Sequence, residues 1–125
     1  LEMGETWEQC AIRECEEETG IVLERAQFLA VTNDHMPEDG KHYVTIIMIG
    51  VCASDQVAKL MEPEKCEGWS WEDWGKMPSP LFHPLSKLVR SGFELPSSEQ
   101  VKQGNVFART PPGLRMGCGI DLSTV

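Results

Sequence analysis

Residues 5–21 read ETWEQCAIRECEEETGI, and this stretch decides the fold. Thr6, followed three residues later by Gln9, is typical of a capping box, in which two side chains satisfy backbone N–H groups at the start of a helix. Gly20 is typical of a helix end, because glycine readily adopts the left-handed conformation that turns the chain away. The stretch therefore predicts a helix over residues 6–19.

The predicted helix gathers carboxylates on one face. At about 100° per residue, Glu14, Glu17 and Glu18 fall on the same side, where like charges repel unless a cation lies among them. Hard divalent ions such as Mg²⁺ and Mn²⁺ prefer oxygen ligands and can join carboxylates to phosphates. Arg13 precedes the cluster, and its planar fork is suited to holding a carboxylate in one direction. The ordinary alternative for such a charge run is a solvated surface.

Length and charge narrow the classes of function. The chain has 125 residues, which fits one domain, and a formal net charge of −9. Polymeric nucleic acid is excluded as a partner, because binding it depends on Lys and Arg displacing counterions. A phosphorylated small molecule stays open if divalent cations lie between carboxylates and phosphates.

The apolar runs and the cysteines indicate in which cellular compartment the protein is expected. The longest apolar run, VTIIMIGVCA, is the size of a strand rather than a membrane span. The first residues lack the basic and apolar regions of a signal peptide. The five cysteines are odd in number and show no CxxC spacing, so they indicate neither a disulfide framework nor a zinc site. We therefore expect a cytoplasmic protein without a membrane partner.

Three later segments have the pattern of β-strands. Residues 26–33 and 69–74 partly alternate apolar and polar side chains, and residues 42–53 are a long β-branched run. Because the run at 42–53 is apolar on both sides, we expect it deep in a sheet. Residues 78–93 predict a second helix, with Pro84 in its first turn. Three strands leave open edges and apolar faces, so we expect the first strands of the domain to be missing from this chain.

Two segments have the composition of loops. The stretch DHMPEDGK, residues 34–41, contains a proline and an Asp-Gly pair, which are typical of a turn. Residues 95–125 are rich in Gly, Pro and Ser and show no sustained period, so we expect a flexible tail there.

The first predicted helix matches a longer pattern. Glu5, seven further residues and then RECEEETGI agree at every fixed position with the signature of the Nudix family, and the chain resembles that family. The stretches HYVTI and MEPEKCEGWSWEDW are similar to segments of small plant MutT-like Nudix hydrolases, of the Nudix hydrolase 1 type. The resemblance runs from Leu1 to about Phe93. It implies a partial Nudix hydrolase domain over residues 1–94, truncated at its N-terminus, followed by a divergent tail over residues 95–125.

The resemblance implies the fold class and the reaction. The fold is α/β, an α/β/α sandwich with a mixed sheet that here lacks its first strands. The activity is hydrolysis of nucleoside-diphosphate-linked compounds, in which a metal ion assists the attack of water on phosphorus. Such small-molecule substrates include 8-oxo-dGTP and other nucleoside triphosphates, dihydroneopterin triphosphate, NADH and, for some plant relatives, geranyl diphosphate. The alternative is a catalytically impaired fragment that acts as a binding module. Family members often form homodimers.

The resemblance also assigns the site. Glu14 and Glu18 would be the metal ligands, with Glu17 sharing the site and with Mg²⁺ or Mn²⁺ as the cofactor. Glu17 or a loop carboxylate would take the proton from the attacking water. Glu64 is the first choice for that loop carboxylate and Glu62 the second, and either can instead be solvated.

Other residues receive plainer interpretations. By resemblance, Arg13 counts among the catalytic residues because it orients the glutamates. The tryptophans of the WSWEDW segment are most often core residues, with stacking on a nucleobase as the rarer alternative. Cys15 takes the apolar position of the signature and is interpreted as a small hydrophobe. Three histidines are scattered through the sequence without metal-ligand spacing, which indicates surface or core positions: His35, His42 and His83.

Overall fold

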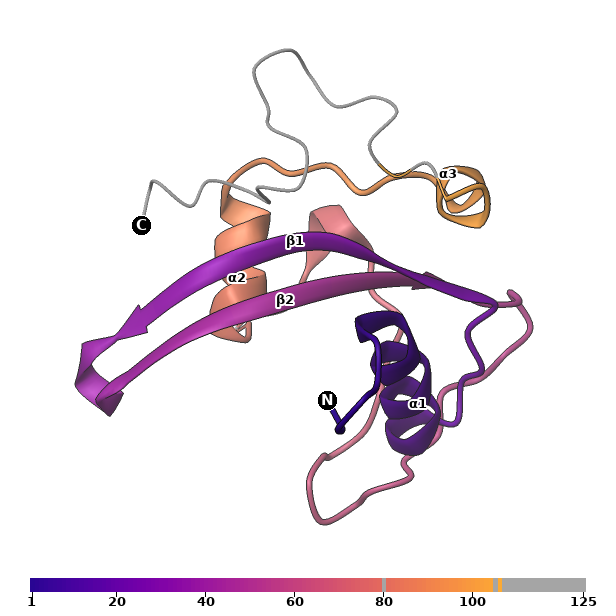
Figure 1. Cartoon of the computed structure of the whole chain (residues 1–125), viewed down its shortest axis with the longest axis horizontal. Coiled ribbons are helices and arrows are strands. Elements are labelled where there is room, and N and C mark those ends of the chain that lie inside the picture. Colours follow the sequence, from indigo (N-terminus) through magenta and orange to yellow (C-terminus); the bar gives the residue numbers. More distant parts are fainter. Residues whose placement is uncertain (80, 105, 107–125) are drawn as a thin grey trace. The chain divides into compact units, whose positions relative to one another are not determined.

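The computed structural model of the chain describes residues 1–79, 81–104 and 106. The described elements are labelled in Figure 1 and have the following bounds: α1 (Trp7–Thr19), β1 (Arg25–Met36), the 3₁₀ turn η1 (Pro37–Asp39), β2 (Lys41–Val51), the 3₁₀ turn η2 (Trp74–Lys76), α2 (His83–Arg90) and α3 (Ser98–Lys102). They belong to two compact units. Of the described residues, the first unit comprises 1–28, 48–71 and 97–104, and the second comprises 29–47, 72–96 and 106.

Helix α1 has the ends that its sequence predicts. The Gln9 backbone N–H donates to Thr6 Oγ1 at 3.1 Å, and the Thr6 backbone N–H donates to Gln9 Oε1 at 2.9 Å, so the capping box is complete. Gly20 has φ 74°, and its N–H donates to the Glu16 carbonyl at 2.9 Å. The predicted helix is therefore confirmed, because its start and its end both depend on local hydrogen bonds.

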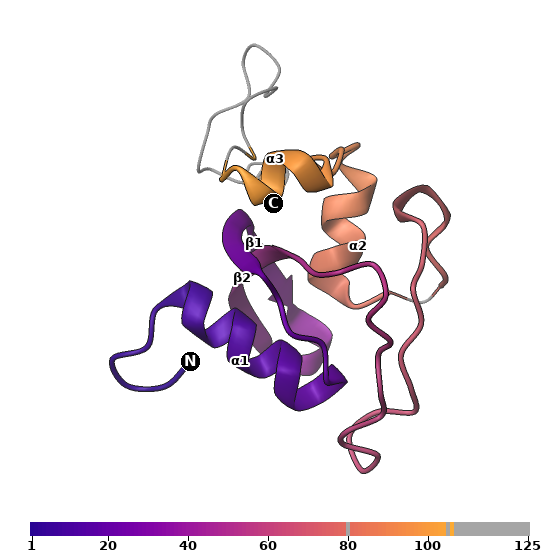
Figure 2. The same cartoon turned by 90° about the vertical axis from the view of Figure 1, so that its right-hand side faces the viewer.

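Strands β1 and β2 form an antiparallel hairpin (Figure 1 and Figure 2). Each of the two strands contributes residues to both units. The turn between them is η1 followed by Gly40, which has φ 64° and donates its N–H to the Pro37 carbonyl. The turn predicted for residues 34–41 is thereby confirmed at its tip. Helices and a sheet together confirm the α/β class, and the sheet of the described residues is this hairpin.

The expectation that β2 lies deep in a sheet is wrong for the described residues. Val44 is 69% exposed and Tyr43 is 53% exposed. Strand β2 pairs with β1 as its neighbour in the described two-stranded sheet, so a long β-branched run lies at an edge. An apolar pattern predicts a strand, but its burial depends on which neighbours are present.

The strand predicted over residues 69–74 is also wrong. The described chain has no regular element at 69–73, and η2 begins at Trp74. The Trp69 indole N–H donates to the Glu18 carbonyl at 3.0 Å, and Trp71 is 69% exposed. Alternation of side chains gives a strand only where a partner strand takes the backbone hydrogen bonds, and here the segment contacts α1 instead.

Each unit has its own small core. In the first unit the buried apolar residues are Ile21, Ala26, Val51 and Val101. In the second unit they are Leu29, Ala30 and Leu88, and Pro84 at the start of α2 is buried beside them. The predicted second helix is thus confirmed as α2, with proline in its first turn as expected.

A short part of the predicted flexible tail is helical. Helix α3 begins with a second capping box, formed by Ser97 and Gln100, and buries Val101. Most of the tail prediction concerns residue 105 and residues 107–125, which lie outside the described residues. Among the helices of the described part, none is long and apolar enough to cross a membrane.

Candidate active site

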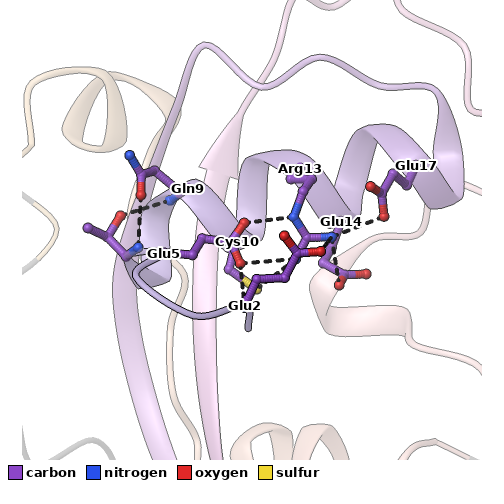
Figure 3. Close-up of polar contacts among 8 residues, drawn as sticks. Glu2, Glu5, Gln9, Cys10, Arg13, Glu14 and Glu17 are labelled. Carbon is purple, nitrogen blue, oxygen red and sulfur yellow. Dashed lines mark hydrogen bonds and ion pairs between the residues drawn. The ribbon is translucent and has the colours of Figure 1, made fainter.

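Arg13 is held by a two-point contact with Glu5, eight residues earlier (Figure 3). Arg13 Nε donates to Glu5 Oε1 at 2.7 Å, and Nη2 donates to Glu5 Oε2 at 3.0 Å. The side chain of Glu5 is only 11% exposed, against 26% for Arg13. Because both ends of the guanidinium fork are used, this pair fixes the plane as well as the position of the arginine.

The third nitrogen of the guanidinium, Nη1, points toward the acidic face of α1, which is formed by Glu14, Glu17 and Glu18. Arg13 Nη1 lies 3.1 Å from Glu17 Oε2 and 3.2 Å from Glu14 Oε1, and Glu2 is more distant at 3.9 Å (Figure 3). Arg13 therefore contacts two of the three glutamates predicted to hold metal. The orienting role that the resemblance implies for Arg13 stays a prediction, and these ion pairs are the contacts it would use.

Glu5 is the most strongly perturbed carboxylate of this cluster. Its pKa is lowered from 4.5 to about 2, first by the hydrogen bond from Arg13 and then by the backbone N–H of Glu2. The pKa of Arg13 is raised in turn, chiefly by the hydrogen bond to Glu5. Both shifts favour the charged forms, so the pair stays ionised across the neutral range.

Glu18 has the opposite electrostatic environment. Its pKa is raised, first by desolvation and then by the negative charges of Glu14 and Glu62. The ammonium of Lys65 opposes this shift, but it forms an ion pair with Glu62 at 2.8 Å. A carboxylate that is short of positive charge is where a cation would be most stabilising.

The loop after β2 brings one of its two candidate carboxylates toward α1. Glu62 is among the groups that raise the pKa of Glu18, and its side chain is 26% exposed. Glu64 is exposed, and its charge acts on Lys65. Glu62, the second choice from the sequence, is therefore the loop carboxylate whose charge raises the pKa of Glu18.

The three predicted metal ligands fit a hard divalent ion in chemistry but do not converge as they stand. Within the described residues, no group of three His, Cys, Asp or Glu side chains is arranged to hold a metal ion. Glu14 and Glu17 instead turn toward Arg13, while their side chains stay 44% and 56% exposed. Since Arg13 keeps Glu5 as its main partner, rotation of these two exposed side chains toward Glu18 costs little.

An apolar groove lies on another side of α1, within the first unit. It has a volume of about 710 Å³ and is lined by α1 residues such as Cys15, by the end of β2, and by Trp69 and Trp71. The predicted core role of these tryptophans is not borne out, because they are 46% and 69% exposed. The hydrogen bond from the Trp69 indole to the Glu18 carbonyl joins the groove to the last turn of α1.

Sequence reasoning missed Glu5 as the anchor of Arg13. The signal was present, because Glu5 opens the signature and its spacing to Arg13 spans two turns of helix plus the cap. The Glu5–Arg13 pair could not be predicted from the spacing alone, because Glu5 lies before the capping box and Arg13 lies within α1. The two side chains meet only when the cap fixes the path of the chain that enters the helix.

Comparisons with known proteins show which family and which solved structure the chain resembles. The family profile described as NUDIX domain matches residues 1–91. The crystal structure of the MutT NUDIX hydrolase from Burkholderia pseudomallei is similar with a TM-score of 0.54 and 32% sequence identity. The match covers 63% of this chain and 60% of that chain, so the present chain spans about 60% of the length of the solved relative.

Proposed function

The chain belongs to the Nudix family, and from this premise we propose that it hydrolyses nucleoside-diphosphate-linked small molecules with the help of a divalent metal ion. One observation carries the proposal. Glu14, Glu17 and Glu18 share the end of α1, beside an arginine that Glu5 holds in place, and Glu18 lacks enough positive charge around it. A bound divalent metal ion would supply that missing charge and would join the carboxylates to a diphosphate group.

The metal would be held by Glu14, Glu17 and Glu18. Mg²⁺ is the first choice and Mn²⁺ the second, because both prefer carboxylate oxygens and water. When bound, such an ion screens phosphate charge and lowers the pKa of a bound water. With a net charge of −9 the protein needs this screening to admit an anionic substrate.

The protein's own residues would position the glutamates and move the proton. Arg13 acts as a positioning residue, since it contacts Glu14 and Glu17. Glu17 and a loop carboxylate are the candidates for accepting the proton of the attacking water. Between the loop residues, Glu62 is better supported than Glu64 because it lies close enough to influence Glu18.

The substrate is proposed only as a class. Candidates are 8-oxo-dGTP and other nucleoside triphosphates, dihydroneopterin triphosphate, NADH and geranyl diphosphate. These compounds share a diphosphate group joined to a larger organic group. The acidic face of α1, formed by Glu14, Glu17 and Glu18, would bind only the diphosphate group. We expect a cytoplasmic protein, with four free cysteines among the described residues as support, and a homodimer as its assembly.

The activity is tested by measuring the release of pyrophosphate or monophosphate from the candidate substrates in the presence of Mg²⁺. The parent chain is compared with Glu18→Gln, which removes one charge from the acidic face, and with Glu16→Gln, an exposed residue on the opposite side of α1. We expect turnover in the parent and in Glu16→Gln, and a loss of about a hundredfold or more in Glu18→Gln. Equal turnover in all three proteins would contradict the proposed site.

A second candidate is a diphosphate-binding module without turnover. It is favoured by the ion pairs that draw Glu14 and Glu17 to Arg13, since these keep the three carboxylates apart. Calorimetric titration with a nucleoside diphosphate and Mg²⁺ separates the two candidates. Binding without product release supports the module, and binding with release supports the hydrolase.

A further inference from the structure

The β1–β2 hairpin brings together two histidines that lie seven residues apart in the sequence. The rings of His35 and His42 have centroids 5.2 Å apart and planes inclined at 47°. Both residues are exposed, and both belong to the second unit. Met36 and Lys41 flank the turn at 37–40. His35 and His42 are the next residues along the two strands away from the turn, so they lie opposite each other across the hairpin.

This spacing suits two imidazoles that share one metal ion. Imidazole nitrogens bind zinc at roughly 2.0–2.1 Å, so two rings in a tetrahedral arrangement have centroids roughly 5 Å apart. The observed 5.2 Å agrees with that value. Zn²⁺, Ni²⁺ and Cu²⁺ accept imidazole ligands readily, whereas Mg²⁺ does not.

Asn33 sets which nitrogen of His42 is available. His42 Nε2 lies 2.6 Å from Asn33 Oδ1, and since an amide oxygen only accepts hydrogen bonds, Nε2 carries the proton. In the neutral ring Nδ1 then keeps its lone pair and can bind a metal. Histidine ligands in metal sites commonly donate their other N–H to such an oxygen, which fixes the tautomer and the ring.

A lysine of α2 holds Asn33 in place, and the adjacent turn carries two carboxylates. Lys87 in α2 donates from Nζ to the Asn33 carbonyl at 2.6 Å, which ties this point of β1 to the helix of the same unit. The turn next to the histidines carries Glu38 and Asp39, both exposed. Their negative charges offset the positive charges of Lys87, which contacts Asn33, and of Lys41, which precedes His42.

We propose that His35 and His42 form a two-histidine site for a borderline transition-metal ion such as Zn²⁺ or Ni²⁺, with Asn33 as the positioning residue and water in the remaining coordination positions. The site is separate from the acidic face of α1, because its residues lie in the second unit and prefer a different class of metal. A bound ion would join the two strands beside the turn and so stabilise the tip of the hairpin.

The test is a Zn²⁺ titration of the ¹⁵N-labelled chain in excess Mg²⁺, followed through the imidazole nitrogen resonances. We expect the Nδ1 resonance of His42 and the ring of His35 to shift together, while His83, an exposed histidine at the start of α2, does not. Zn²⁺ binding that leaves the His35 and His42 resonances unmoved would overturn the proposal, since the ion would then occupy thiols or carboxylates.

Variants separate the ligands from the positioning residue. His35→Gln and His42→Gln should each weaken Zn²⁺ affinity roughly tenfold or more, and His83→Gln should leave it unchanged. Asn33→Ala should weaken it about tenfold and allow His42 to bind through Nε2 as well as Nδ1. Parent-like affinity in either His→Gln variant at the hairpin would contradict the site, and parent-like behaviour of Asn33→Ala would contradict the role of the amide.

Discussion

Arg13 and Glu5 form a two-point ion pair, with 2.7 Å between Nε and Oε1 and 3.0 Å between Nη2 and Oε2. The same guanidinium reaches Glu14 and Glu17 with its remaining nitrogen, Nη1. One carboxylate thus anchors the arginine, and the arginine holds the two glutamates that would otherwise repel each other. Arg13 therefore orders the side chains of Glu14 and Glu17 before any metal binds, and these two side chains must still turn toward Glu18 to share one ion.

Arg13→Lys keeps the positive charge but removes the planar fork, so Glu5 and the α1 glutamates can no longer be held by one group. We predict that kcat for diphosphate hydrolysis falls about a hundredfold, because misplaced ligands cost that much even when every charge is present. The measurement is kcat from steady-state kinetics of the parent chain and of Arg13→Lys. Arg90→Lys, an exposed arginine at the end of α2, is the matched control and should behave as the parent chain. Unchanged kcat in Arg13→Lys would show that the fork is dispensable.

The low pKa of Glu5 gives a pH dependence with a defined sign. Its pKa in the folded chain is about 2, below its ordinary value of 4.5, so its contribution to stability is fully present above pH 4.5 and is lost as the pH falls toward 2. We predict that Glu5→Gln is less stable than the parent at pH 6 and that the difference shrinks between pH 4.5 and 2. Urea unfolding at a series of pH values measures it, and a difference that is constant with pH would refute the assignment.

The end of α1 depends on a glycine. Gly20 has φ 74°, and a Cβ there would meet the Lys59 side chain only at an ordinary distance of 3.6 Å, so strain comes from the backbone and not from crowding. Gly20→Ala should lower the free energy of unfolding by roughly 1–2 kcal/mol. Gly75→Ala is the control, since a Cβ at that position meets nothing within 4 Å. Thermal unfolding of the two variants should separate them, and equal transitions would argue against the left-handed cap.

Features that depend on neighbouring residues in the chain could be predicted from the sequence. The capping box of Thr6 and Gln9 and the glycine end of α1 need only hydrogen bonds within a few residues, and both are observed. The same rule could have found α3, because Ser97 and Gln100 have the same spacing. That helix was missed since its surroundings, rich in Gly, Pro and Ser, masked a short local signal.

Features that depend on residues distant in the chain could not be predicted from the sequence. The long apolar pattern of β2 identifies a strand, but Val44 is exposed because burial depends on strands and helices that the pattern does not specify. The alternation at residues 69–74 gave no strand for the same reason. The pairing of His35 with His42 needs the register of the hairpin, and a scan for closely spaced metal ligands does not supply it.

Asp34, in the second unit, has a buried carboxylate oxygen that lacks a hydrogen-bond partner among the described residues. It is fully buried, Thr32 Oγ1 donates to its Oδ2 at 2.7 Å, and its Oδ1 has no hydrogen-bond partner among the described residues. Asp34→Asn removes a carboxylate from a site that satisfies only one of its oxygens. We predict a gain of about 1 kcal/mol in the free energy of unfolding.

The matched control for this substitution is Asp39→Asn, because Asp39 is exposed in the turn η1. It should change the stability by less than about 0.5 kcal/mol, as surface substitutions usually do. Urea unfolding of both variants at neutral pH is the measurement. A loss of stability in Asp34→Asn would contradict this prediction, because it would mean that the buried carboxylate stabilises the fold.

The central claim is that three glutamates at the end of α1 bind one divalent metal ion, and Mn²⁺ tests it most directly through the relaxation rate of water protons. The parent chain should enhance this relaxation on titration with Mn²⁺, and a variant with Gln at Glu14, Glu17 and Glu18 should lose the enhancement while Glu16→Gln keeps it. If the triple variant enhances relaxation as strongly as the parent, the ion binds elsewhere, and the proposed function loses its metal site.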